Sequence, residues 1–452
     1  MDYRLAVRVE SVSQTQIQDQ NASPSGEISQ LAEHLFRHES GKLVSVLTGI
    51  FGFDRLQLAE DVVQESLVRA MQTWPYYGIP KNPAAWLTQT AKNIAVDVLR
   101  REKLFRDKEP QITTHIEQWS DNSDGNHLPL MEGEIKDDRL RLMFASCHPL
   151  LPPEAQTALT LKALCGFSIP EIAKAFLTTE AAIAKRLTRA RQRIRDLQIP
   201  FEIPSGQELG VRLDGVLQSL YLLFNEGYKA STGDRLVKEE LCHEAIRLAT
   251  LLAEHSVGNQ PRTHALLALM LLNGARLTAR TDTWGNLLCL EDQDRSNWSQ
   301  PMIGRGMLHL AQSANGDELT EYHLQAGIAA CHCAAPDYAS TNWAQILALY
   351  DQLMEVDDSP IVALNRAVVV AKVHGPSAGI KAVEAIQNRQ TLKSYYLLYA
   401  VLAEFEKQLN NGKAAADYLR KAIQLTEVKA EHALLSKRLR DCEEQKLVSE
   451  LA

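Results

Sequence analysis

The sequence lacks most features that mark secreted, membrane-spanning or enzymatic proteins. Its seven cysteines are scattered, odd in number and without paired spacing, which argues against a disulfide framework. The polar first 26 residues show no signal peptide, and no apolar run approaches the length that crosses a bilayer. Common nucleotide-binding, hydrolase and metalloprotease motifs are missing too. We therefore expect a cytoplasmic protein that is not an enzyme, needs no cofactor and does not contact a membrane.

Aromatic residues and alternating β-branched runs are also scarce, with aromatics at 6% of the chain. Because Ala and Leu are abundant instead, the composition predicts an all-α fold. A chain of 452 residues is too long for one core, so several domains are expected. The net charge is −8, and almost all of the acidic excess lies after residue 200. A surface that binds nucleic acid must therefore be local and lie in the first half.

The stretch Leu164–Pro200 has the pattern of a short helix, a tight turn and a longer helix. Ser168 can cap the first helix, with Glu171 as its capping-box partner, and Thr179 can cap the second. Apolar residues recur along the second helix at steps of three and four, namely Ile183, Leu187, Ala190, Ile194 and Leu197.

Residues 179–198 carry six Lys or Arg against two acids. A helix that is apolar on one side and basic on the other, behind a tight turn, is typical of a helix-turn-helix that enters a DNA major groove. The alternative is an ordinary basic surface helix of a bundle.

An earlier helical unit contains the amphipathic segment Ala59–Trp74, a stiff loop Pro75–Asn82 and a helix Pro83–Glu102 that Asn82 can cap. The residues expected to face inward on the two helices are Val62, Leu67, Ala70, Met71, Leu87, Ala91, Ile94 and Val98. Trp86 falls on another side, among Gln89, Asn93 and Arg100. That face suits stacking on single-stranded bases, although Trp86 can equally pack against a neighbouring helix.

The remaining segments are polar or helical. Residues 107–138 carry nine acids against two bases, as expected of a solvated linker. Leu397–Leu425 has the spacing of one TPR-like helix pair, and the second half predicts a bent solenoid of about five or six pairs. Such a solenoid can bind a protein or peptide partner, or it can be a structural appendage. We expect no metal site at His323, Cys331, His332 and Cys333, because positions 331 and 333 point to different sides of a helix.

Several ordered motifs together resemble regions 2 and 4 of a bacterial extracytoplasmic-function (ECF) sigma factor. They are "AEDVVQES", "NPAAWLTQTAKNIAVDVLRR" and the helix-turn-helix. "LYLLFNEGYKAS", "LCHEAIRLATLLAEH", "LEDQDRSNW" and "SPIVALNRAVVVAKVHGP" extend the resemblance to the subgroup with a large C-terminal TPR-like domain. The implied division is a disordered extension (1–27), region 2 (28–103), an acidic linker (104–138), region 4 (139–200) and the TPR-like domain (201–452).

The resemblance implies two partners, namely core RNA polymerase, through its β′ clamp and β flap, and promoter DNA. The residues that would dock on the clamp are Asp61, Gln64 and Glu65. Those that would bind the melted −10 element are Tyr76, Tyr77, Trp86, Lys92, Asn93 and Arg100. Those that would contact the −35 duplex are Thr179, Glu180, Ala181, Ala184, Lys185, Thr188, Arg189 and Arg193. Arg189, Arg191 and Arg193 are expected to hold phosphates rather than to read bases.

Three functions fit these patterns. The first is a sigma factor whose C-terminal domain regulates it in cis. The second is a helix-turn-helix regulator with a TPR sensor domain that acts without docking on polymerase. The third is an interaction scaffold with an incidental basic helix. The segment Ala59–Arg101 favours the first, because only a sigma factor has a specific use for it.

Overall fold

A computed structural model describes residues 39–101, 137–176, 178–201, 207–230, 237–282, 287–426 and 428–451. Within these ranges the secondary structure is helical except for one isolated β-bridge between Thr281 and Leu287, which confirms the all-α prediction. None of the described helices is long and apolar enough to span a bilayer. The expected N-terminal extension and nearly all of the expected acidic linker lie outside the described residues.

Region 2 consists of a helix over 39–51, a short 3-10 helix η1 (Phe53–Arg55), α2 (Leu56–Tyr77) and α3 (Pro83–Arg101). The amide of Ala85 donates to Oδ1 of Asn82 over 3.1 Å, so the predicted cap of α3 is confirmed. Two expectations are wrong: α2 continues through Pro75 to Tyr77 instead of ending at Trp74, and Met71 is exposed.

Region 4 consists of α5 (Asp138–Ser146), α6 (Pro153–Ala163), α7 (Ile169–Ala175) and α8 (Glu180–Asp196). The capping box of Ser168 and Glu171 and the Thr179 cap of α8 are both present, as predicted. The predicted apolar stripe of α8 is buried apart from Leu197. That residue is exposed because the helix ends at Asp196 and Leu197 lies at its C-cap.

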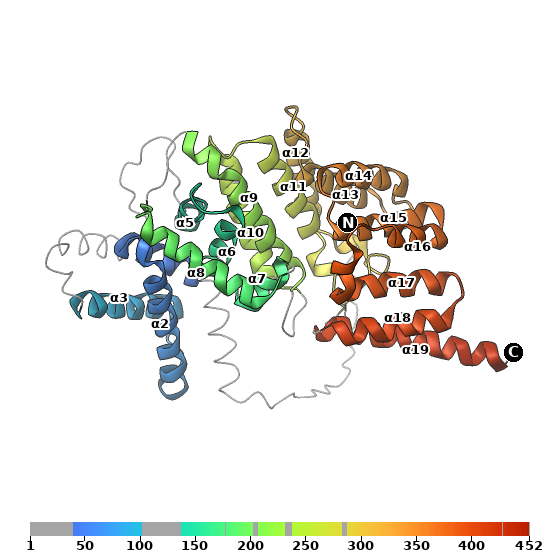
Figure 1. Cartoon of the computed structure of the whole chain (residues 1–452), viewed down its shortest axis with the longest axis horizontal. Coiled ribbons are helices and arrows are strands. Elements are labelled where there is room, and N and C mark those ends of the chain that lie inside the picture. The colour runs from blue at the N-terminus through green and yellow to red at the C-terminus, as the bar shows by residue number, and fades with distance from the viewer. Residues whose placement is uncertain are drawn as a thin grey trace, which may run out of the picture.

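Helices α9 (Gln207–Tyr228) and α10 (Glu239–Glu254) pack directly on region 4 (Figure 1). Their apolar residues belong to the same continuous core as those of regions 2 and 4. The fully buried members contributed by α9 include Leu213, Val216, Leu217 and Leu220. Within the described residues, the helices that directly follow α8 therefore share a hydrophobic core with regions 2 and 4.

The rest of the chain forms a row of helices, each packed on its sequence neighbours and extending away from α2 and α3 (Figure 1). The helices are α11 (Pro261–Gly274), α12 (Gln300–Ser313), α13 (Glu321–Ala334), α14 (Trp343–Val356), α15 (Pro360–His374), α16 (Pro376–Glu384), α17 (Tyr396–Gln408), α18 (Gly412–Leu425) and α19 (Lys429–Leu451). Separate apolar clusters lie along this row. Its description as TPR-like stays a prediction.

Candidate polymerase and promoter interfaces

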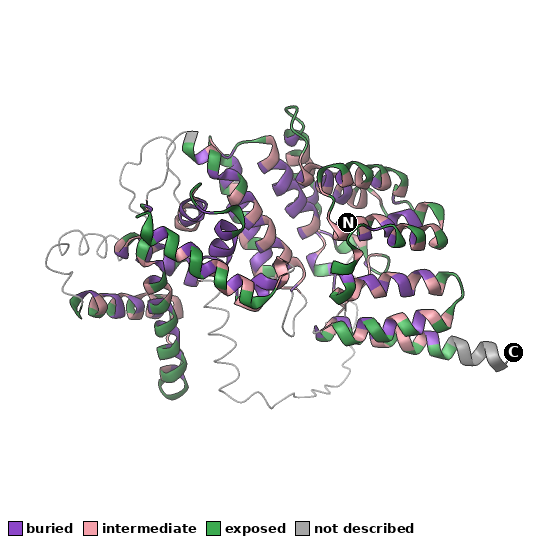
Figure 2. Cartoon of the chain, viewed as in Figure 1, coloured by how far each residue is buried: buried purple, intermediate pink, exposed green. Residues whose placement is uncertain are grey.

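One side of α2 carries the residues expected to dock on polymerase. Asp61, Gln64 and Glu65 are all exposed, and they lie on adjoining turns of the helix. Glu65 forms an exposed 3.0 Å ion pair with Arg69, which contributes little to stability. The far end of α2, away from α8, is largely exposed in Figure 2. The apolar side chain of Val68, in the middle of the same helix, is also exposed. The α2 surface thus offers acidic, amide and apolar groups to another protein.

The expected −10 residues lie at the end of α2 and on α3. Trp86 is half-buried, and its ring meets the buried Trp74 ring edge-on, with centroids 5.6 Å apart. In the structure Trp86 therefore packs against the neighbouring helix α2, and part of its ring stays accessible to solvent. Tyr76 and Tyr77 are exposed, as are Asn93 and Arg100, whereas Lys92 is half-buried. Asn93 accepts a 3.0 Å hydrogen bond from the side-chain amide of Gln89.

The leading end of α8 is open on the side expected to face duplex DNA. The residues expected at the −35 element are exposed except Ala184, which is half-buried. Thr179 caps the helix by accepting from the amide of Ala182, and Thr188 donates to the carbonyl of Ala184 over 2.9 Å. In the described part of the chain, Lys185, Arg189 and Arg193 form no ion pair, so their charges are available to a partner.

Arg191, which the sequence led us to expect at phosphates, pairs with a carboxylate of region 2 in this structure. Its Nη2 atom lies 2.6 Å from Oε2 of Glu60 on α2, and the two side chains are only 15% and 11% exposed. Burial raises the pKa of Glu60 by more than the charge of Arg191 lowers it. The pair ties α8 to region 2, and a spacing rule could not have found it, because 131 residues separate the partners.

Further contacts hold region 2 against region 4. Phe53 and Phe201 pack with ring centroids 6.0 Å apart, and Ser45 Oγ donates to the carbonyl of Asp138 over 2.7 Å. Gly41 lies so close to Leu164 that a Cβ atom there would overlap the Leu164 carbonyl oxygen. The two regions are therefore docked through hydrogen-bonded, charged and tightly apposed surfaces.

A buried ionic cluster joins region 4 to the C-terminal domain. Nζ of Lys238 lies 3.0 Å from Oε1 of Glu171 on α7 and 2.7 Å from Oε1 of Glu226 on α9. The three side chains are 11%, 3% and 5% exposed, respectively. The other oxygen of Glu171 accepts from the amide of Ser168 over 2.8 Å. Glu171 therefore completes the capping box of the helix-turn-helix and also binds the C-terminal domain, a second role that its local motif does not reveal.

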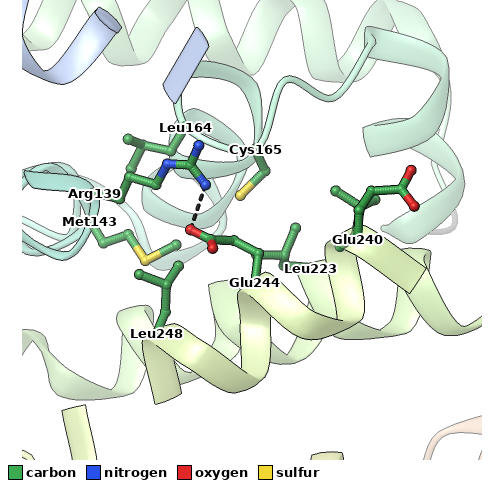
Figure 3. A pocket seen from close by; sticks show the side chains of 9 residues that line it. Arg139, Met143, Leu164, Cys165, Leu223, Glu240, Glu244 and Leu248 are labelled. Carbon is green, nitrogen blue, oxygen red and sulfur yellow. Dashed lines mark hydrogen bonds and ion pairs between the residues drawn. The ribbon is translucent and has the colours of Figure 1, made fainter. Parts of the chain in front are cut away.

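Helix α10 makes a second set of ionic contacts with region 4 (Figure 3). Nη1 of Arg139 lies 2.5 Å from Oε1 of Glu244, the pair drawn in Figure 3. Nη1 of Arg247 lies 2.8 Å from Oδ2 of Asp137. Burial opposes ionisation of Glu244, but hydrogen bonds from Arg247 and the charge of Arg139 bring its pKa below the usual value. The gap between these elements measures about 20 Å³, room for a single water molecule, so it is a packing gap and not a ligand site.

The Cys and His residues considered for metal have other contacts. His323 takes part in the N-terminal cap of α13, and Sγ of Cys333 donates to the carbonyl of Leu272 over 3.5 Å. In the part of the chain that the structure describes, no group of three or more His, Cys, Asp or Glu side chains could hold a metal ion.

Comparison with known families divides the chain into the same three parts, namely region 2, region 4 and a C-terminal part. Residues 35–105 match Sigma-70 region 2, residues 141–194 match Sigma-70, region 4, and residues 212–314 match a family of unknown function, DUF6596. The last match covers the helices from α9 to α12, including those that contact region 4.

Individual relatives give a consistent result. An uncharacterized protein of Rhizobium meliloti (strain 1021) is 37% identical over 392 residues, which is 86% of this chain and 90% of the relative. The ECF RNA polymerase sigma-E factor of Haemophilus influenzae is 27% identical over 137 residues, 30% of this chain and 72% of the relative. The ECF RNA polymerase sigma factor SigW of Bacillus subtilis is 25% identical over 139 residues, 30% of this chain and 73% of the relative. No solved structure matches the chain significantly. With both sigma regions in order and a helical domain attached to the second, the chain belongs to the ECF family of RNA polymerase sigma factors.

Proposed function

We propose that the C-terminal helical domain of this sigma factor regulates it in cis by controlling the position of region 4. The protein acts in transcription initiation with core RNA polymerase and promoter DNA, as its sigma regions imply. The observation that carries the proposal is the buried cluster of Lys238, Glu171 and Glu226. Because α9 also shares its core with region 4, any displacement of the C-terminal domain must move the helix-turn-helix or expose apolar surface.

The C-terminal domain contacts region 4 on the side away from the basic face of α8. It touches α5 and α6 and pairs with Glu171 on α7, whereas Lys185, Arg189 and Arg193 remain exposed. Direct covering of the DNA-binding residues is therefore not the favoured mode of control. The favoured mode is positional, in which the domain sets where region 4 lies relative to region 2.

The docked arrangement of regions 2 and 4 is incompatible with simultaneous reading of the two promoter elements. Elements at −10 and −35 lie about 25 base pairs apart, or about 85 Å along B-DNA. Two domains of this size have radii of gyration of about 11 Å each, so a docked pair cannot cover that distance. Contacts such as Glu60–Arg191 must break before both elements are bound. Core polymerase, which would bind Asp61, Gln64 and Glu65 through its β′ clamp and region 4 through its β flap, would supply the energy for this opening.

Exposed side chains of α2, α3 and α8 are the expected DNA contacts. Tyr76, Tyr77 and the open part of Trp86 would stack on bases of the melted −10 element, and the polar groups of α3 would bind beside them. The exposed start of α8 would read the −35 duplex. A helix-turn-helix regulator that acts without polymerase is the alternative, and it leaves the exposed surface of α2 without a role.

We expect the free protein to bind promoter DNA weakly, because its exposed basic residues are confined to short surfaces on an acidic chain. With core polymerase, it should bind specifically and open the −10 region. Gel-shift titration with and without core, together with permanganate reactivity of −10 thymines, measures both effects. Tight, sequence-specific binding by the protein alone would support the alternative.

Two substitutions on α8 should separate base reading from phosphate binding. Lys185→Ala is expected to cost about 1–3 kcal/mol at one −35 position through a lost base contact. Arg193→Ala should weaken binding evenly across sequences and lower the salt slope by about one. Holoenzyme binding to a library of −35 variants at several salt concentrations measures both quantities. Identical behaviour of the two variants would refute the assignment of roles.

A further inference from the structure

A polar cleft lies within the part of the chain that matches the family of unknown function. It opens between the C-terminal end of α10, the start of α11 and the second half of α12, and its volume is about 680 Å³. This is within the range of small-molecule sites. Its lining includes Glu254, His264, Arg305 and His309 together with amide side chains. None of these residues takes part in the sigma surfaces described above.

Two histidines form a hydrogen-bonded pair in this cleft. The Nδ1 atoms of His264 and His309 are 3.0 Å apart, and the planes of the two rings differ by only 15°. Nε2 of His264 lies 2.9 Å from Oδ1 of Asn259, to which it donates when the ring is neutral. Nδ1 of His264 then accepts from Nδ1–H of His309, which leaves Nε2 of His309 free of the pair. Burial lowers the pKa of both histidines, which favours this neutral arrangement.

Charges of opposite sign flank the pair. Glu254 on α10 and Arg305 on α12 both act electrostatically on His309, the carboxylate raising its pKa and the guanidinium lowering it. Both side chains are exposed, and neither forms an ion pair within the described ranges. The cleft therefore presents one unneutralised negative and one unneutralised positive group on different walls, with a fixed imidazole between them.

We propose that this cleft binds a small zwitterion, of the class of free amino acids and short peptides. The carboxylate of Glu254 would bind the ammonium group of the ligand, and the guanidinium of Arg305 would bind its carboxylate in a bidentate manner. The imidazole of His309 would contact the polar atoms between these two ends. A ligand with a single charge would pair with only one of the two charged side chains and leave the other without a partner.

Helix α10 connects this cleft to region 4. Its middle carries Glu244 and Arg247, which pair with Arg139 and Asp137, and its last turn carries Glu254 in the cleft. The ten residues from Glu244 to Glu254 span about 15 Å of helix. A ligand that draws Glu254 toward Arg305 would therefore act on a rigid element that also holds region 4. This coupling rests on the proposed regulation in cis, whereas the binding site does not.

Isothermal titration calorimetry of the full chain with the standard free amino acids and glycylglycine tests the site. At least one of these zwitterions should bind, and N-acetylglycine and glycinamide, which carry one charge each, should bind much more weakly or not at all. Glu254→Gln and Arg305→Gln should each weaken binding about 10- to 100-fold, because each removes the charged partner of one end of the ligand. Glu384→Gln and Lys381→Gln, which remove exposed charges from α16, should leave affinity unchanged.

The site is refuted if no member of this panel binds, or if binding survives both cleft substitutions. Thermal unfolding of each variant checks folding, and the exposure of Glu254 and Arg305 predicts unchanged midpoints. Transcription with core polymerase, with and without the bound zwitterion, then tests the coupling. A ligand that binds in the cleft but leaves transcription unchanged would contradict the coupling between the cleft and region 4 while confirming the site.

Discussion

Replacing Lys238 by methionine is expected to lower the free energy of unfolding of the unit formed by region 4, α9 and α10 by about 3–5 kcal/mol. The change leaves Glu171 and Glu226 buried without the ammonium group that lies between them. Methionine has a similar length and fills the space, so the loss is electrostatic rather than a cavity effect. Urea unfolding measures the size of the loss, and hydrogen exchange over α7 and α8 shows where in the structure it falls.

A matched control is available in the solenoid. Arg366→Met removes a single partner from an ion pair with Asp351 in which both side chains are substantially exposed, and it should cost at most about 1 kcal/mol. Adding Glu171→Gln and Glu226→Gln to Lys238→Met removes the buried negative charges and should restore most of the stability. Equal losses for Lys238→Met and Arg366→Met would show that the cluster does not join region 4 to the C-terminal domain.

Gly41→Ala is expected to separate region 2 from region 4. The new Cβ atom would overlap the carbonyl oxygen of Leu164, and a backbone atom cannot rotate aside as a side chain can. Overpacking of this kind typically costs about 1–3 kcal/mol, which corresponds to a shift of about 5- to 150-fold in the docking equilibrium. Energy transfer between dyes on α3 and α6 should report a longer distance. Open complexes should form faster at limiting core polymerase, since part of the opening has already occurred.

Gly49→Ala on the same helix is the control for this experiment. Its Cβ atom would lie 3.7 Å from Cε1 of Phe201, an ordinary contact. Both substitutions raise helix propensity by about 1 kcal/mol, so the difference between them isolates the overlap with Leu164. If both variants report the wild-type distance, Gly41 does not determine docking. A longer distance with slower open-complex formation would mean that the docked state assists initiation instead of opposing it.

The features that the sequence predicted well are local. The caps by Asn82, Ser168 and Thr179 each depend on a residue three positions away, so a few consecutive residues are enough to predict them. The buried stripe of α8 follows from helical periodicity in the same way. Two predictions at helix ends were wrong: α2 runs on past Trp74, and α8 ends before Leu197. The free energy changes little when a helix ends one turn earlier or later, so sequence places helix ends poorly.

The features that the sequence could not predict join distant segments. Arg191 belongs to a basic run that reads as a phosphate-binding surface, and only the docked fold shows that it pairs with Glu60. Lys238 lies outside every motif, yet it binds two carboxylates from different helices. Such contacts depend on tertiary packing and leave no periodic signal. The contacts of Lys238 are also the ones on which the proposed regulation by the C-terminal domain depends.

Control of region 4 by the C-terminal domain, as proposed here, requires region 4 to work as one unit with the helices that follow it. Run-off transcription with purified core polymerase, comparing the full chain with a chain that ends at Phe201, tests this most directly. The shortened chain loses α9 and α10, and with them the buried residues Leu213 and Leu217 and the partners of Arg139 and Glu171. We expect specific, core-dependent transcripts from the full chain and a loss of −35-dependent initiation from the shortened one. Indistinguishable transcript yields, with unchanged hydrogen exchange over α8, would contradict the account.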